Sequence, residues 1–252
     1  MEHLIDRITN VINELRVSMD LDWRFSIERY TATPDGESLV ELSSKEVLDA
    51  LLGRLSGIDI IEGPQGEFRT DDSGGSVVIR LLQPSEGKRL WVSSSVADVR
   101  RGPIHATELV SQAIMGEDVA SLKLEDDWYM VVMQDGYIGW IRSWYLREAS
   151  VEDISAYRGN ANAMVRANIT YVRESADPES LPVTDLVAGT LVSAGEPSGG
   201  FRKILLPGAR EGFAPEADFE DIPGQVAPSG DRLVSRAMRF VGIPYLWGGT
   251  SA

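Results

Sequence analysis

Cysteine is absent from the 252 residues of this chain, and histidine occurs only twice. Without cysteine the chain can form no disulfide, and it has no thiolate for catalysis or metal binding. The two histidines, His3 and His105, lie far apart in the sequence. Zinc sites need three or four ligands, usually including closely spaced pairs. The sequence therefore predicts neither thiol chemistry nor a zinc site within this chain.

Positive charge and long apolar runs are also scarce. There are 24 Lys and Arg residues against 39 Asp and Glu, a net charge of −15, which argues against nucleic acid and anionic lipid as partners. No run of 18 apolar residues occurs, so we expect no membrane span. Residues 1–6 lack the basic region and apolar core of a secretory signal. We therefore expect a cytoplasmic protein, with export by another route left open.

The N-terminal part, residues 1–88, carries alternating helix and strand signals. Apolar residues recur at helical spacing over 4–17, and residues 23–30 alternate large apolar and polar side chains as a strand does. Ser43 begins a capping-box pattern that opens a second helix, and 77–82 reads as a short buried strand. We predict a small α+β domain of unknown role.

Beyond this domain, two stretches of the chain repeat the same pattern of short strands and turns. Each has a strand ending in Val-Arg, an acidic loop, a strand, a strand that opens on an aromatic residue, a tight glycine turn and a short strand. The period is roughly 70 residues with about five strands per unit, which predicts two small β-barrels.

The motifs of the first unit resemble those of bacterial SH3 (SH3b) domains. They are Val-Ala-Asp-Val-Arg at 96–100, Gly-Glu-Asp-Val at 116–119 and Asp-Gly-Tyr-Ile-Gly-Trp-Ile at 135–141. Gly136 permits the turn, and Gly139 lets the backbone bend at a barrel corner. In the second unit Phe213-Ala214 stands where Gly-Trp-Ile would be, so that unit is a degraded version. The resemblance predicts SH3b-like barrels over 89–150 and 151–222.

The C-terminal part begins with a linker at 223–230, which is rich in Pro and Gly. In the following residues, 231–252, Asp231 caps an amphipathic helix whose apolar side is expected to face inward. The helix leads into Tyr-Leu-Trp-Gly-Gly at 245–249. This order resembles the start of the catalytic domain in NlpC-type cell-wall peptidases, where a cysteine nucleophile follows within a few residues. We expect the incomplete first part of an α+β, papain-like peptidase domain, truncated before that cysteine.

The resemblance implies a parent enzyme similar to dipeptidyl-peptidase VI. Such an enzyme cleaves the bond between γ-D-glutamate and the diamino acid of muropeptides by thiolate attack, without a metal or cofactor. The expected partners are peptidoglycan stem peptides or muropeptides. This chain alone is predicted to be inactive, because it lacks the nucleophile and the general base.

By the same resemblance, three aromatic residues are candidate substrate contacts, and none is a catalytic nucleophile. Tyr245 would stand beside the nucleophile in an accessory role, with Trp247 close to it in the motif. Tyr137, in the closing motif of the first unit, would help to wall off the cleft and to require a free N-terminal L-Ala. The alternatives are a packed aromatic for Tyr245 and an exposed strand residue for Tyr137.

Two other classes of function stay open. Paired SH3b units in a non-catalytic protein would hold peptidoglycan stems or a partner peptide, and a scaffold would dock a separately encoded peptidase. The aromatic group containing Trp128, Trp140 and Trp144 suits a sugar- or peptide-stacking surface, although packing in a small barrel is favoured. An in-frame continuation past Ala252 into a cysteine motif would favour the enzyme.

Overall fold

The computed structural model divides the chain into two compact units, which are treated separately. One contains Met1–Pro84 with Asp135–Ile138, and the other contains Ser85–Gln134 with Gly139–Ala252. The residues described are 4–32, 37–55, 59–63, 67–72, 75–84, 88–222 and 230–250. His3 and most of the predicted linker, 223–229, lie outside them.

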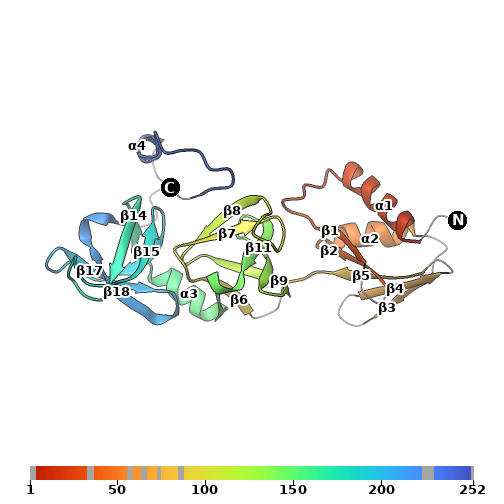
Figure 1. The fold of residues 1–252 in the computed structure, drawn as a ribbon, viewed down its shortest axis with the longest axis horizontal. Helices are drawn as coiled ribbons and strands as arrows, with labels where there is room; N and C mark the ends of the chain where they lie inside the picture. The colour runs from red at the N-terminus through yellow and green to blue at the C-terminus, as the bar shows by residue number, and fades with distance from the viewer. Residues whose placement is uncertain are drawn as a thin grey trace. The chain divides into compact units, whose positions relative to one another are not determined.

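The first unit is built on a five-stranded sheet with two helices packed against it (Figure 1). Its elements are α1 Leu4–Ser18, β1 Glu28–Ala32, β2 Ser38–Leu42, α2 Lys45–Arg54, β3 Ile60–Glu62, β4 Glu67–Asp72 and β5 Gly75–Leu81. The strand order is β1-β2-β5-β4-β3, with β2 and β5 parallel and the other pairs antiparallel. Ile8 and Leu15 of α1 and Leu51 of α2 join Val40 and Ile79 of the sheet in one apolar core.

Both helices and the strand at 77–82 confirm the sequence predictions, but two local details were wrong. The segment 23–25 is a turn, and β1 starts only at Glu28. The turn forms because Asp22 accepts two hydrogen bonds. Its side-chain carboxylate accepts from the Arg24 backbone N–H at 3.0 Å, and its backbone carbonyl accepts from the Phe25 backbone N–H at 2.9 Å. The cap of α2 is Ser44, whose hydroxyl accepts from the Val47 backbone N–H at 3.3 Å.

The second unit holds two seven-stranded sheets. The second sheet of the protein comprises β6 Lys88–Val92, β7 Val96–Arg100, β8 Leu109–Ile114, β9 Asp118–Glu125, β10 Trp128–Val132, β11 Ile138–Arg142 and β12 Leu146–Ser150. The third comprises β13 Ala163–Val165, β14 Ile169–Arg173, β15 Pro182–Val187, β16 Leu191–Ala194, β17 Phe201–Leu206, β18 Arg210–Pro215 and β19 Phe219–Asp221.

These two sheets have the same strand order, β12-β6-β9-β10-β11-β7-β8 in one and, read from the other end, β19-β13-β16-β17-β18-β14-β15 in the other. A 3-10 turn precedes the last strand in both, η2 Ser143–Tyr145 and η4 Glu216–Asp218. The shared order confirms the internal repeat. Each repeat has seven strands rather than five. The strands β6, β8 and β12 and their counterparts were missed because they lack a strong alternating pattern.

Helix α3, Val151–Asn160, joins the two sheets and was not predicted from the sequence. Its N-terminus is capped by Ser150, whose hydroxyl accepts from the Asp153 backbone N–H at 3.0 Å. The Tyr157 ring meets Trp91 edge-on at 5.1 Å between ring centres, and its hydroxyl donates to the Leu191 carbonyl at 3.0 Å. The helix thus contacts both sheets. The described helices include none that is long and apolar enough to cross a membrane.

Candidate functional site

The predicted C-terminal helix is present as α4, Gly230–Met238, but its apolar side does not face inward. Leu233, Val234 and Met238 are all more than half exposed. An amphipathic pattern fixes which side chains share a face, whereas burial of that face needs a partner surface. The expectation that these side chains are packed was therefore wrong for this structure.

After α4 the chain runs along the outer strand of the second sheet. The Thr250 backbone N–H donates to Gln112 Oε1 at 3.1 Å, and the Thr250 hydroxyl donates to the Gln112 carbonyl at 3.0 Å. Gln112 lies on β8, an edge strand. Gly248 adopts a φ of +71°, and a Cβ there would lie only 2.5 Å from the Leu109 carbonyl oxygen. A glycine is needed at 248 because the backbone turns into the left-handed region while it touches β8.

Tyr245 and Trp247 are the most exposed candidate residues. The exposed fractions are 83% for Tyr245 and 62% for Trp247. They flank Leu246 in a segment whose end is held on β8 by Thr250. Both side chains are accessible for contact with a ligand, and their roles remain predictions.

Tyr137 belongs to the first compact unit, through the turn Asp135–Ile138. Its ring meets that of Phe25 edge-on at 5.2 Å, and the Arg24 guanidinium carbon lies 5.9 Å from the ring centre. Hydrogen bonds from Arg24 lower the pKa of Asp22 beside it. Tyr137 is half-buried by these neighbours, and its role in substrate binding stays a prediction. The sequence could not predict Phe25 as its partner, because the two are more than a hundred positions apart.

The aromatic group of the second sheet divides into buried and exposed members. Trp128 and Trp140 are buried, as favoured from the sequence, whereas Trp144 is 57% exposed. The His105 ring meets Trp128 edge-on at 5.1 Å and stacks on Trp144 at 6.2 Å. The Arg142 guanidinium lies 4.1 Å from the centre of the Trp144 ring. Trp144 thus presents an aromatic surface that is held in place by a cation and an imidazole.

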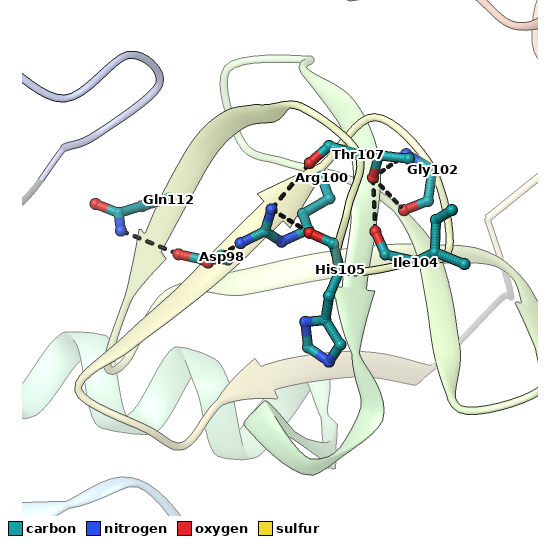
Figure 2. Close-up of polar contacts among 7 residues, drawn as sticks. All are labelled: Asp98, Arg100, Gly102, Ile104, His105, Thr107 and Gln112. Carbon is teal, nitrogen blue, oxygen red and sulfur yellow. Dashed lines mark hydrogen bonds and ion pairs between the residues drawn. The ribbon is translucent and has the colours of Figure 1, made fainter.

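A charged network supports the loop that carries His105 (Figure 2). Arg100 donates to the backbone carbonyls of His105 at 2.8 Å and Thr107 at 2.9 Å, and it pairs with Asp98 at 2.7 Å. Gln112 donates to the second oxygen of Asp98 at 3.1 Å.

Residues 99–144, which contain this loop and the network apart from Asp98, match the family model of the bacterial dipeptidyl-peptidase SH3 domain. This part of the chain is similar to bacterial SH3 domains. The match covers β8 to β11 and the 3-10 turn that carries Trp144. Within it, β8 is the edge strand that holds Thr250. The matched region therefore contains the exposed Trp144 and the strand β8, which contacts the C-terminal segment through Gln112.

The chain is also similar to two curated enzymes, each named gamma-D-glutamyl-L-lysine dipeptidyl-peptidase. It is 26% identical over 178 residues to that of Bacillus cereus, covering 64% of this chain and 51% of the relative. It is 24% identical over 179 residues to that of Bacillus subtilis, covering 68% and 57%. The chain thus spans little more than half the length of the curated relatives it matches.

A crystal structure of an NlpC/P60 family protein from Bacillus cereus has a similar fold, with a TM-score of 0.53 at 18% identity. The similarity covers 65% of this chain and 67% of that one. The predicted resemblance to NlpC-type peptidases with bacterial SH3 domains is confirmed, and the mostly β fold with three sheets is consistent with it.

Proposed function

We propose that this chain forms the substrate-restricting, non-catalytic part of a cysteine endopeptidase that acts on peptidoglycan-derived peptides. The observation that carries the proposal is the SH3 domain with Tyr245 and Trp247 exposed on a segment held at its edge strand. In the finer domain order, the α+β domain precedes two SH3b-like barrels, and 231–252 begins the peptidase domain. The names of both curated relatives support a γ-D-glutamyl peptide as substrate.

The chemistry requires a group that this chain does not contain. A thiolate would attack the γ-glutamyl carbonyl carbon, the amine of the diamino acid would leave, and water would hydrolyse the acyl-enzyme. The chain has no cysteine, so by itself it is inactive. Its contribution is to bind and restrict: Tyr137 and Trp247 contact the substrate, and Tyr245 assists at the developing oxyanion. Its place of action in this proposal is the cytoplasm.

The test uses the tripeptide L-Ala-γ-D-Glu-L-Lys and two proteins, the 252-residue chain and the full product of its gene. The chain should release nothing, and the full product should release L-Ala-γ-D-Glu in a reaction that a Cys→Ala change abolishes. Tyr245→Phe in the full product should lower kcat, whereas a merely packed Tyr245 would leave it unchanged. Activity that survives the Cys→Ala change, or a full product that is inactive and has no cysteine, would overturn the proposal.

A second candidate, a peptidoglycan-binding module, is favoured by one observation. Trp144 presents an exposed ring beside Arg142 and His105, as an aromatic stacking site for a sugar or peptide would. Retention of the chain on purified peptidoglycan tests it. Trp144→Ala should abolish retention and Trp247→Ala should not, if the module is the function. The reverse pattern would support the peptidase proposal.

A further inference from the structure

A line of hydrogen bonds crosses two strands of the SH3 domain and links its loop to Gln112 (Figure 2). Gln112 in turn contacts Thr250 of the C-terminal segment. On β8, Gln112 Nε2 donates to Asp98 Oδ1 at 3.1 Å, and on β7, Arg100 Nη2 donates to Asp98 Oδ2 at 2.7 Å. Asp98 and Gln112 are direct partners in the strand register. The two bonds engage both oxygens of one carboxylate, which holds Asp98 and Gln112 in a single arrangement.

This arrangement decides which way the Gln112 amide points. An ionised carboxylate only accepts hydrogen bonds, so the NH2 group of Gln112 must face Asp98. Its oxygen then faces the other way, where it accepts from the Thr250 backbone N–H at 3.1 Å. The Thr250 hydroxyl adds a bond to the backbone carbonyl of Gln112 at 3.0 Å. An amide flip would bring two donors together and break the bond from the Thr250 backbone N–H, leaving only the bond to the Gln112 backbone carbonyl.

The other end of the line lies in the loop at 101–108. Arg100 Nη1 donates to the carbonyls of His105 and Thr107, at 2.8 and 2.9 Å. The Thr107 hydroxyl closes the loop by donating to the Ile104 carbonyl at 2.7 Å and accepting from the Gly102 backbone N–H at 3.3 Å. One guanidinium group therefore holds the loop conformation and Asp98 at the same time.

The internal repeat shows that the fold does not require the carboxylate and amide of this line, although Arg173 donates to the Ser180 carbonyl of its own loop as Arg100 does to that of His105. In the third sheet, Tyr171 and Asp185 stand opposite one another on β14 and β15, as Asp98 and Gln112 do on β7 and β8. Arg173 occupies the place of Arg100, and its guanidinium carbon lies 5.8 Å from the Tyr171 ring centre. The same strand order thus forms with an aromatic residue at the position of Asp98. The polar line belongs to the sheet that holds the C-terminal segment.

We propose that Gln112, Asp98 and Arg100 are positioning residues that fix Gly248–Thr250 on the edge of β8 and couple this segment to the loop at 101–108. Their effect on Tyr245 and Trp247 as substrate contacts rests on the proposed function. The docking itself does not, since every contact lies within residues 98–250 of this chain.

The experiment measures backbone order in the 252-residue chain by 15N relaxation. A docked Thr250 should have an order parameter of about 0.85, and in a released segment the order parameter falls below about 0.6. Gln112→Leu removes the amide and should release Gly248–Thr250. Asp98→Asn should give a partial release, because the amide orientation is no longer fixed.

The matched control is Gln134→Leu. Gln134 Nε2 also donates to an aspartate of this sheet, Asp118 Oδ1 at 3.3 Å, but away from the C-terminal segment. It should leave Thr250 ordered. If Thr250 stays ordered in Gln112→Leu, or if Gln134→Leu releases it equally, the proposal is wrong.

A variant outside the sheet guards against loss of folding. Gly248→Ala puts a Cβ against the Leu109 carbonyl and should release Thr250 while the side-chain NH2 signals of Gln112 change. Unchanged Gln112 signals would contradict the docking. In the full gene product, Gln112→Leu should raise KM for the tripeptide. If Gly248–Thr250 is docked in the 252-residue chain but the full product has no peptidase activity, the proposed function is wrong and the docking stands.

Discussion

In the second sheet Gly139 precedes Trp140, and at the matching position of the third sheet Gly212 precedes Phe213. Both glycines press against a Val-Arg strand: a Cβ at Gly139 would lie 2.4 Å from Val99 Cγ1, and a Cβ at Gly212 would lie 2.5 Å from the Arg173 carbonyl oxygen. The following residues pair with the arginines, Trp140 with Arg100 and Phe213 with Arg173. The repeat thus keeps the close crossing and changes the aromatic residue.

The polar residues differ more than the glycines do. Asp118 at the start of β9 is only 4% exposed and pairs with Arg89 at 2.6 Å and with Arg158 of α3. Its counterpart at the start of β16 is Leu191, which is half-exposed. Backbone crossings are therefore what this fold requires, whereas buried charges and polar lines are additions to the second sheet.

The largest expected effect is that of Asp118→Asn. Two guanidinium groups would lose their carboxylate, and removing one partner of a buried ion pair costs about 3 kcal/mol or more. We expect the free energy of unfolding to fall by about 3 kcal/mol, measured by urea denaturation. Leu191→Ala, the matched change in the third sheet, should cost less than about 1 kcal/mol. Equal losses at the two positions would contradict the distinction.

Gly139→Ala or Gly212→Ala should lower the free energy of unfolding by about 2–3 kcal/mol, because a Cβ has no room at either position. The two corners should differ in rescue. Val99→Ala removes the nearest atom at Gly139 and should recover part of the loss in Gly139→Ala. Val172→Ala should not rescue Gly212→Ala, since a backbone oxygen remains in the way. Gly159→Ala in α3 is the control, with open space around it, and should be neutral or stabilising.

The helix between the sheets should give a pH-dependent effect. Burial raises the pKa of Tyr157 to about 12, from an ordinary value of 10.0. The neutral phenol is favoured in the folded state, so its stabilisation is complete below pH 10 and is lost as the pH rises from 10 through 12. A shift of this size corresponds to roughly 2–3 kcal/mol.

Urea denaturation between pH 9 and pH 12 measures this loss. Tyr157→Phe should remove that part of the alkaline destabilisation, whereas Tyr171→Phe, at a half-exposed position of the third sheet, should keep it. A wild-type-like alkaline profile for Tyr157→Phe would show that the junction does not depend on this hydroxyl.

The smallest effect concerns the two aromatic residues after the glycines. Trp140 is 3% exposed, and the Lys123 ammonium lies 5.4 Å from its ring. Trp140→Phe should cost about 1–2 kcal/mol in the free energy of unfolding, because it leaves a cavity. Phe213 is only half-buried, and Phe213→Leu should cost less than about 1 kcal/mol. A larger loss in Phe213→Leu than in Trp140→Phe would mean that the third sheet depends more on Phe213 than the second sheet does on Trp140.

Local pattern predicted the elements whose signal lies within a few residues. The apolar spacing of α1 and α2 and the shared motifs of the repeat led to the correct elements. Helix α3 was missed because only Ile154 and Tyr157 are buried along it, too few to produce a periodic signal. The cap of α2 was placed one residue early, since Ser43 and Ser44 are chemically alike and only the backbone direction separates them. The domain boundaries and the three candidate contacts remain predictions.

The sequence by itself determined that this chain has no thiol nucleophile, that it contains a repeated strand pattern and that one repeat carries the motifs of a bacterial SH3 domain. Each of these depends on which residue types occur and at what spacing. Only the tertiary structure decided that Gln112 meets Thr250, that Phe25 covers Tyr137 and that the apolar side of α4 is exposed. Such contacts join residues far apart in the chain, or depend on whether a surface has a partner, and no local pattern carries that information.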